Sequence, residues 1–288
     1  MSTAPGVSFA PTGSSDLPLS PPSPGLLLPA LSLAQRELVR FLRQRHRVIG
    51  ALATPIVFWL LIGGGMGRSF QVKGLPGGGD YLRFFFPGTI VMILLFTAIF
   101  STISVIEDRR EGFLQSVLVA PVPRMAIVLG KVLGGTALAF GQGVVFLLLS
   151  PLLGIRPPLE GWILALVIMA VVSFALTALG FCIAWRMSST QGFHAIMNLF
   201  LMPMWFLSGA LFPANGAWGV LQWVMALNPL TYGLAGLRRA MYWGDMSVAN
   251  APNLPGMTLC IGVSVAFAIV LFLLASVIAR KTTAADLQ

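Results

Sequence analysis

The 288-residue sequence has few charged residues, which make up 9% of the chain against 57% for apolar residues. Soluble domains carry about 25% charged residues, so most of this chain has no aqueous surface to cover. The only two cysteines, Cys182 and Cys260, fall inside apolar runs, where we expect small apolar side chains and no disulfide. The two histidines, His46 and His194, have no second histidine or carboxylate at ligand spacing, which argues against a metal site.

Catalytic and nucleotide-binding motifs are also missing from the sequence. No Gly-x-Ser-x-Gly motif and no Ser-His-Asp order occurs. The pair Gly130-Lys131 lacks the rest of a phosphate-binding loop, because the required glycine position holds Met125 and the next residue is Val132. We therefore expect no enzyme activity, no cofactor and no ATP hydrolysis on this chain.

Six apolar runs are long enough to cross a membrane, since a hydrocarbon core of about 30 Å needs about 20 helical residues. Backbone groups in lipid must be bonded within the segment, so these runs are predicted to be helices. The predicted spans are roughly Val48–Met66, Phe84–Ile106, Met125–Leu153, Trp162–Trp185, Ala195–Phe212 and Met257–Ala279. The sequence thus predicts an all-α membrane protein with one transmembrane domain over residues 31–281.

The N-terminal region divides into two parts. Residues 1–30 are rich in Pro, Ser and Gly and predict a disordered tail. Over residues 31–47, apolar and basic residues occupy different helical faces, which favours a helix in the headgroup plane; a solvated cap before the first span is the alternative. The apolar face would hold Leu31, Leu38, Phe41 and Leu42, and the basic face Arg36, Arg40, Arg43 and Arg47. Residues 282–288 are expected to form a short cytoplasmic tail.

The distribution of Lys and Arg predicts the orientation of the spans. With six spans, the side of both termini carries twelve of these 18 residues: Arg36, Arg40, Arg43, Arg45, Arg47, Arg109, Arg110, Arg124, Lys131, Arg186, Arg280 and Lys281. The other side carries six: Arg68, Lys73, Arg83, Arg156, Arg238 and Arg239. Both termini are therefore expected in the cytoplasm, with the chain in the plasma (inner) membrane. The net charge of +9 is explained by topology and anionic lipid, so no nucleic-acid partner is expected.

Five consecutive charged residues lie directly between the second and third runs: Glu107, Asp108, Arg109, Arg110 and Glu111. The segment after them has the pattern of a short amphipathic helix, which Pro121 and Pro123 end, and a basic return through Arg124 and Lys131. We interpret it as a helix held at the membrane surface, with the turn before Lys131 at the interface. The alternative is a loop whose charges only anchor the ends of two spans.

A long segment with short apolar runs, residues 213–256, lies between the fifth and sixth spans. It predicts two short re-entrant helices at the outer face. Asn228 before Pro229 is typical of a helix N-cap followed by proline at the first position. Arg238 is expected to reach the outer headgroups or, alternatively, an anionic cargo. A seventh partial span is disfavoured, because it would leave Arg238 and Arg239 without a suitable place.

Small residues on the third span include Gly130 and Gly134, whose spacing lets two helices approach closely. The partner of this surface is left open, since it is either another helix of the same chain or a second copy at a dimer contact.

Two blocks of residues carry a resemblance to a known family. The first block consists of Glu107, Glu111, Gly112, Leu114, Leu118, Val119, Pro121, Val122, Arg124, Gly130 and Lys131. The second contains Pro203, LSGALFP at 207–213, LQWV at 221–224, NPLTY at 228–232 and Arg238. In this order, over about residues 31–281, the chain resembles the type 2 permeases of ABC transporters, which include drug-resistance, nodulation-factor and polysaccharide-export permeases. The chain departs from the family pattern at Gln115, where the family has Glu, and at Ala120, where the family has Thr. A third departure is AWGV at 217–220, where the family often has Leu-Pro.

The resemblance implies a permease that binds a separate ATPase subunit, which would carry ATP and Mg, and that pairs with a second permease. The implied ATPase-coupling residues are Glu107, Arg109, Arg110, Glu111, Gly112, Leu114, Leu118, Pro121 and Arg124. The polar rim would consist of Glu107, Arg109, Arg110 and Glu111. The apolar residues Leu114 and Leu118, with Phe113 and Val117, would face lipid or fill a groove. The implied outer-gate residues are Pro213, Asn228, Pro229, Thr231, Tyr232 and Arg238.

The expected function is the membrane subunit of an ATP-driven exporter for a hydrophobic or amphipathic substrate, such as a drug, lipid, glycolipid or polysaccharide. The first alternative is an ion-coupled secondary transporter or channel. The nine acidic residues all fall in the tail, in loops or at span boundaries, which disfavours this alternative, since ion-coupled carriers use membrane-embedded carboxylates. An intramembrane enzyme or scaffold is the second alternative, and the sequence contains no catalytic cluster to support it.

Overall fold

The computed structural model describes residues 25–66, 81–119, 122–214, 217–245 and 254–281, excluding the side chains of residues 45–48, 51–52 and 118. Every regular element within these ranges is a helix. The long helices and their short extensions are α1 (Leu27–Arg43), α2 (Arg45–Met66), α3 (Tyr81–Ser101), α4 (Ile103–Arg110), α6 (Arg124–Leu147), α7 (Leu159–Ala184), α8 (Thr190–Trp205) and α12 (Met257–Lys281). The shorter elements are α5 (Phe113–Val119), η2 (Ser150–Leu153), η3 (Phe206–Ala210), α9 (Gly219–Leu227) and α10 (Pro229–Met241).

Five helical stretches of the described chain are long and apolar enough to cross a membrane. They are Tyr81–Arg110, Arg124–Leu153, Leu159–Ala184, Thr190–Ala210 and Met257–Lys281. A sixth, α2, has a shorter apolar part, Ala53–Met66. These helices lie where the six spans were predicted, and the all-α membrane fold is confirmed.

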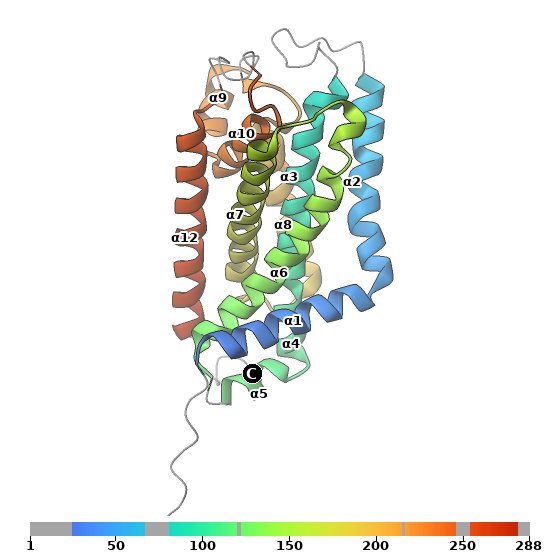
Figure 1. The fold of residues 1–288 in the computed structure, drawn as a ribbon. Helices are drawn as coiled ribbons and strands as arrows, with labels where there is room; N and C mark the ends of the chain where they lie inside the picture. The colour runs from blue at the N-terminus through green and yellow to red at the C-terminus, as the bar shows by residue number, and fades with distance from the viewer. Residues whose placement is uncertain (1–24, 67–80, 120–121, 215–216, 246–253, 282–288) are drawn as a thin grey trace, which may run out of the picture.

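The bundle is built around α3, which Figure 1 shows between α2, α6, α7 and α8. In the most apolar stretch of the α3–α4 span 83% of the residues are buried, against 28% in α12 at the edge of the bundle. The first turns of α3 pack aromatic rings closely, with Phe86 stacked on Phe146 of α6 at a centroid distance of 4.8 Å. The central helix therefore connects the two ends of the molecule.

Helix α1 lies across one end of the bundle, and α9 and α10 lie at the opposite end (Figure 1). We name these the α1 end and the α10 end. Helix α1 begins at Leu27, inside the stretch predicted as a tail of residues 1–30, because its first turns pack on α6. Residues 1–24 and the predicted tail 282–288 lie outside the described residues.

The helix crossing the α1 end differs from the two-faced helix that was predicted. Its buried residues are Ala30, Ala34 and Glu37, whereas Leu31 and Leu42 are exposed. Two arginines of the predicted basic face, Arg36 and Arg40, turn towards α4 and bond Asp108. The buried side of small residues was not predicted, and it packs on α6 because small side chains allow one helix to cross another closely.

The second span also continues further than its hydropathy suggested. Four of the five charges placed in a loop, Glu107 to Arg110, lie in α4, which extends α3 after a short irregularity at Thr102. The sequence predicted that the turn before Lys131 lies at the membrane interface. In the structure Lys131 is buried, about two turns after the start of α6. The helix continues through the charges because partners from other helices surround them.

Candidate functional site

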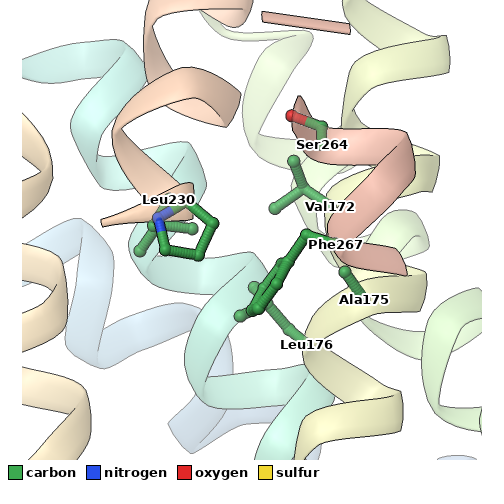
Figure 2. A pocket seen from close by; sticks show the side chains of 7 residues that line it. Val172, Ala175, Leu176, Leu230, Ser264 and Phe267 are labelled. Atoms are coloured by element: carbon green, nitrogen blue, oxygen red, sulfur yellow. The ribbon is translucent and has the colours of Figure 1, made fainter. Parts of the chain in front are cut away.

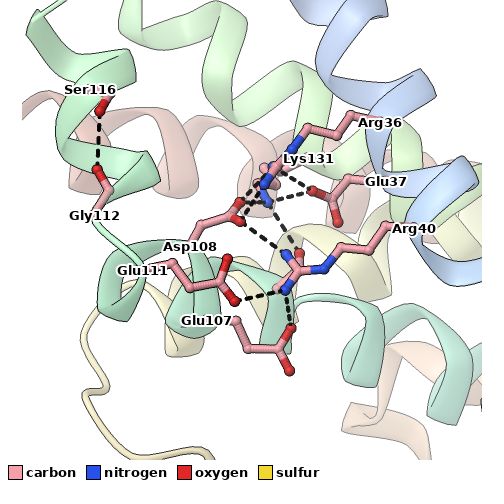
Figure 3. Close-up of polar contacts among 10 residues, drawn as sticks. Arg36, Glu37, Arg40, Glu107, Asp108, Glu111, Gly112, Ser116 and Lys131 are labelled. Atoms are coloured by element: carbon pink, nitrogen blue, oxygen red, sulfur yellow. Dashed lines mark hydrogen bonds and ion pairs between the residues drawn. The ribbon is translucent and has the colours of Figure 1, made fainter. Parts of the chain in front are cut away.

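A cluster of seven charged side chains connects three helices at the α1 end (Figure 3). We call it the charge cluster: Arg36, Glu37 and Arg40 of α1, Glu107 and Asp108 of α4 with Glu111 directly after it, and Lys131 of α6. Asp108 is at its centre and is 0% exposed. Buried charges are costly unless they are paired and hydrogen-bonded, so this arrangement depends on all three helices being in place.

Asp108 accepts hydrogen bonds from three cations. Arg36 Nη2 and Arg40 Nη1 both lie 2.9 Å from Oδ1, and Arg36 Nη1 lies 3.0 Å from Oδ2. Lys131 Nζ also donates to Oδ2. The hydrogen bond with Asp108 raises the pKa of the Arg36 guanidinium above its ordinary value, so Arg36 stays charged at any physiological pH.

Lys131 joins α6 to both other helices. Its Nζ donates to Glu37 Oε1 of α1 at 2.5 Å and to Ser104 Oγ of α4 at 3.2 Å. Arg40 adds contacts at the rim of the cluster, 2.8 Å to Glu107 and 3.4 Å to Glu111. Because Glu111 is 59% exposed, its pair is expected to contribute little to stability.

Two of the glycines on α6, Gly130 and Gly134, lie where α1 crosses this helix. A Cβ atom at Gly130 would lie 2.8 Å from the Ala30 carbonyl oxygen and 2.7 Å from Leu33 Cβ. One at Gly134 would lie 2.8 Å from Glu37 Cβ. The close approach that the spacing predicted is therefore within the chain, and it brings Glu37 within reach of Lys131.

The short helix α5 is attached directly to the charge cluster. Gly112 makes the turn into it with a φ of +74°, in the left-handed region that glycine adopts without strain. The Arg36 guanidinium lies 3.7 Å over the Phe113 ring, and Leu114 is buried. On the other side Gln115 and Ser116 are exposed, and Val119 is 82% exposed. Helix α5 thus presents a free face while its other face is fixed to α1.

The two arginines of α4 point away from the charge cluster. Arg109 donates to the carbonyl oxygens of Trp185 and Met187, and Arg110 donates to that of Ser188 at 3.0 Å. These carbonyls belong to the connection between α7 and α8. The charges predicted to form a rim for an ATPase therefore all have partners within the chain, and their part in coupling stays a prediction.

Arg124 begins α6 and contacts the last turn of α12. Its Nη1 donates to the Arg280 carbonyl oxygen at 2.8 Å. This side chain therefore joins the start of α6 to the end of α12. Pro121 and the side chain of Leu118, both predicted coupling residues, lie outside the described part of the structure.

The α10 end carries a different kind of site, around a break in the α8 span. Pro203 lies inside α8, and Gly209 in η3 has a φ of +84°. A proline and a left-handed glycine interrupt the hydrogen bonds of a helix and leave carbonyl oxygens free. In a membrane such carbonyls need partners from elsewhere in the protein.

Side chains of other segments bond these carbonyls. Asn228 Nδ2 donates to Met204 O at 2.7 Å, Thr231 Oγ1 lies 3.3 Å from Leu207 O, and Tyr81 Oη donates to Leu211 O at 2.9 Å. Arg238 Nη2 donates to Gly209 O at 2.8 Å. We name these four side chains the outer clamp. Pro213, another predicted gate residue, follows directly after the break, where the chain leaves the span.

The Asn-Pro-x-Thr-Tyr sequence begins α10 as predicted. Asn228 caps the helix by accepting a hydrogen bond from Leu230 N at 3.0 Å, and Pro229 is its first residue. Thr231 and Tyr232 bond back to α9, to the carbonyl oxygens of Met225 at 2.7 Å and Ala226 at 2.9 Å. The motif therefore fixes α10 to both α9 and the broken span.

Arg238 lies elsewhere than its predicted position at the headgroups. Its guanidinium lies 4.1 Å from the centre of the Phe84 ring and bonds the break in the α8 span. The neighbouring Arg239 bonds the carbonyls of Leu254 and Pro255 instead. The expectation failed because an aromatic face and a free carbonyl supply a partner for Arg238 inside the protein.

Beneath the start of α10, a small cavity lies between α7, α10 and α12 (Figure 2). Its volume is about 10 Å³, and the side chains around it are apolar except for Ser264. Sites for drug-sized molecules are about 300–1,000 Å³. In this conformation the cavity therefore has no room for a cargo molecule.

The charge cluster was only partly visible in the sequence. Glu107 and Glu111 were predicted as site residues, whereas Asp108, Lys131, Glu37, Arg36 and Arg40 were not. The available signal was a lysine inside an otherwise apolar run next to two helix-packing glycines. Its partner Glu37 lies 94 positions earlier, a separation at which no local pattern reveals a contact.

Comparisons with known proteins agree with this architecture. Residues 30–242 match the family described as ABC-2 type transporter. The putative transport permease ycf38 of Cyanophora paradoxa is 28% identical over 210 residues, covering 72% of this chain and 71% of that protein. Nodulation protein J of Sinorhizobium fredii is 28% identical over 200 residues, covering 67% and 73%. The inner membrane transport permease YadH of Escherichia coli is 23% identical over 250 residues, covering 84% and 91%.

The family match contains both the charge cluster and the outer clamp, since it begins in α1 and ends after α10. The protein therefore belongs to the ABC-2 type transporter family and is a multi-pass membrane permease of an ABC transporter.

Proposed function

We propose that this chain is the permease subunit of an exporter that moves a hydrophobic or amphipathic substrate out of the cytoplasm. A separate ATPase subunit, carrying ATP and Mg, would bind at the α1 end and drive the transport. The relatives named as transport permeases, ycf38 and YadH, support a transport role.

The observation that carries this proposal is the attachment of α5 to the charge cluster. Its free face, with Gln115, Ser116 and Val119, is available to another protein. Its fixed face contacts Arg36, which bonds Asp108 at the end of the central span. A displacement of α5 would reach α1, α4 and α6 together, which is what coupling to ATP hydrolysis requires.

The α1 end is proposed to be cytoplasmic. Helix α1 and the last turn of α12 lie at the same end of the bundle, as an even number of spans requires (Figure 1). The basic residues favour the cytoplasm for that end, and the name of the E. coli relative favours an inner membrane. Two copies of the permease are proposed to pair.

The outer clamp is proposed to act as the gate at the other end. Its side chains fix α10 against the broken span, and α3 connects this region to α4 and the charge cluster. A movement that starts at α5 can therefore change the contacts of Asn228, Thr231 and Arg238.

Two glycines allow a matched test of the coupling role. Gly112 and Gly244 both have positive φ, +74° and +87°, and a Cβ atom at either would meet nothing within 4 Å. Gly112→Leu and Gly244→Leu should each cost about 1–2 kcal/mol of backbone strain, but only Gly112 adjoins α5. We expect Gly112→Leu to abolish cargo-stimulated ATP hydrolysis in the reconstituted complex and Gly244→Leu to preserve it.

Equal loss in both variants would attribute the effect to general strain and contradict the coupling role of α5. Normal activity of Gly112→Leu would place the ATPase contact elsewhere. Transport by the permease alone in response to an ion gradient would favour the secondary transporter.

A further inference from the structure

A groove runs along the surface of the protein between α7 and α12, which lie side by side (Figure 1). It is lined by Val171 and Phe174 of α7 and by five side chains of α12, the first of which is Val265 and the last Leu273. We call it the α12 groove. Its volume is about 310 Å³, against about 10 Å³ for the cavity beneath α10, and its lining is entirely apolar. This volume is at the lower end of the range for small-molecule sites.

The α12 groove results from the sizes of its side chains. Ala268 is small and only 7% exposed, whereas Ile269 and Leu273 in the same lining are 54% and 55% exposed. The Phe174 and Phe272 rings contact each other between the two helices, with their centroids 5.5 Å apart. A small residue among larger ones leaves a hollow that opens away from the bundle, towards lipid.

The α12 groove lies at the depth of the hydrocarbon core. Leu273 lies seven residues before Arg280 at the end of α12, or about 10 Å along the helix axis. Val265 lies fifteen residues before Arg280, or about 22 Å. One leaflet contributes about 15 Å of hydrocarbon. The groove therefore begins inside the leaflet at the α1 end and reaches the centre of the bilayer.

Basic side chains lie at the α1 end of the same two helices. Arg280 and Lys281 end α12, and Arg186 lies two residues after the end of α7. All three are exposed, and no carboxylate of the described residues pairs with them. Arg280 lies seven residues after Leu273 and eleven after Ile269, which is close to two and three helical turns. It is therefore on the same face of α12 as the groove.

We propose that the α12 groove binds one acyl chain of an anionic phospholipid from the leaflet at the α1 end, with Arg280 at the headgroup phosphate. An acyl chain is flexible and apolar, so it can follow a lining that offers only van der Waals contacts. Selection for the anionic headgroup comes from Arg280, with Arg186 and Lys281 adding positive charge at the same end. This site goes beyond the function proposed above and is independent of the ATPase and of pairing.

Other occupants match the α12 groove less well. A helix is about 10 Å across, so a helix of a second copy would cover the groove without filling it. A polar cargo would leave its hydrogen-bonding groups without partners in an apolar lining. A phosphatidylcholine chain fits the hollow, but its headgroup carries a cation of its own and gains less from Arg280.

Photo-crosslinking tests the site in the full-length protein, reconstituted into phosphatidylcholine liposomes. The probe is phosphatidylglycerol with a diazirine in its acyl chain, and phosphatidylcholine with the same group is the comparison. Labelled peptides are identified by mass spectrometry. We expect the anionic probe to label the groove-lining parts of α7 and α12 at least five-fold more than the neutral probe does. This ratio corresponds to about 1 kcal/mol of attraction for one basic residue.

Two pairs of variants locate the acyl chain and the headgroup. Ala268→Leu fills the groove, whereas Ala266→Leu adds the same side chain at an exposed position of α12 outside the lining. Arg280→Gln removes the headgroup contact, whereas Arg43→Gln removes an exposed charge of α1 at the same end. We expect Ala268→Leu to abolish groove labelling by the anionic probe and Arg280→Gln to lower it about five-fold. Both controls should keep wild-type labelling.

Each of the other outcomes overturns the proposal. Equal labelling by the two probes would mean that lipid fills the groove without selection for charge. Unchanged labelling in Arg280→Gln would remove the headgroup contact, and this exposed position allows the test even if Ala268→Leu does not fold. Unchanged labelling in Ala268→Leu would place the acyl chain outside the groove. Labelling of α12 elsewhere but not in the groove, by either probe, would assign the groove to a protein contact. No ATPase or cargo is present, so none of these results depends on the proposed function.

Discussion

The two ends of this permease are held together by different chemistry. At the α1 end, charged side chains from three helices pair with one another around the buried Asp108. At the α10 end, mostly neutral side chains bond backbone carbonyls that a broken helix leaves free. The first arrangement joins whole helices, whereas the second supports one irregular segment.

This difference suggests how force is transmitted through the molecule. A buried charge cannot be left without a partner, so the charge cluster resists separation and its helices move as one body. Single hydrogen bonds to carbonyls contribute about 0.5–1.5 kcal/mol each, and they can be exchanged one at a time. The α1 end is suited to receiving a displacement, and the α10 end is suited to changing shape in response.

The sharpest test of this comparison is the buried carboxylate. Asp108→Asn removes the charge that three cations share, and breaking a buried pair typically costs about 3–5 kcal/mol. We expect a large loss of thermal stability of the purified protein in detergent. Glu111→Gln is the matched control in the same cluster, because its exposed pair with Arg40 should contribute at most about 1 kcal/mol.

Similar melting temperatures for Asp108→Asn and Glu111→Gln would show that the charge cluster is as loosely held as the outer clamp. The contrast between the two ends would then be lost.

The second prediction concerns Gly134, where α1 crosses α6 closely and brings Glu37 to the charge cluster. Gly134→Ala places a Cβ atom 2.8 Å from Glu37 Cβ, and overpacking of this kind costs about 1–3 kcal/mol. We expect α1 to move away from α6, with lower thermal stability and weaker binding of the ATPase. Gly141→Ala on the same helix is the control, since nothing lies within 4 Å of its Cβ position. If Gly134→Ala behaves like Gly141→Ala, the close crossing is not needed.

Much of the architecture could be predicted because local composition determines it. Apolar runs located the spans, and Asn228 before Pro229 located the start of α10, since hydropathy and capping depend on neighbouring residues alone. Gly130 and Gly134 of α6 indicated a close helix crossing for the same reason. Their partner, α1, was left open because spacing describes one surface and not the surface that meets it.

The contacts of charged residues could not be predicted in the same way. Arg36 and Arg40 have the pattern of the basic face of a helix in the headgroup plane, yet they bond Asp108, 72 and 68 positions later. Arg238 has the position of a headgroup anchor, yet it bonds the Gly209 carbonyl, which is free only because η3 is distorted. In both cases the partner exists only after the helices have assembled.

The smallest expected effect belongs to Asn228 of the outer clamp. Its variants distinguish the loss of the helix cap from the loss of the hydrogen bond to the broken span. Asn228→Ala loses both the cap on Leu230 N and the bond to Met204 O. Asn228→Ser keeps a hydroxyl that can cap α10 but is too short to reach Met204. A lost cap costs about 1 kcal/mol, too little to unfold the bundle but enough to shift a closed–open balance about five-fold. We expect export, normalised to membrane-inserted protein, to change in both variants while insertion and dimer formation stay at wild-type levels. Tyr232→Phe, which removes one exposed bond to Ala226 O, should change the export rate less.

A wild-type export rate for Asn228→Ser beside an altered rate for Asn228→Ala would mean that the cap matters and the bond to the broken span does not. Wild-type rates for all three variants would show that neither Asn228 nor Tyr232 controls the gate.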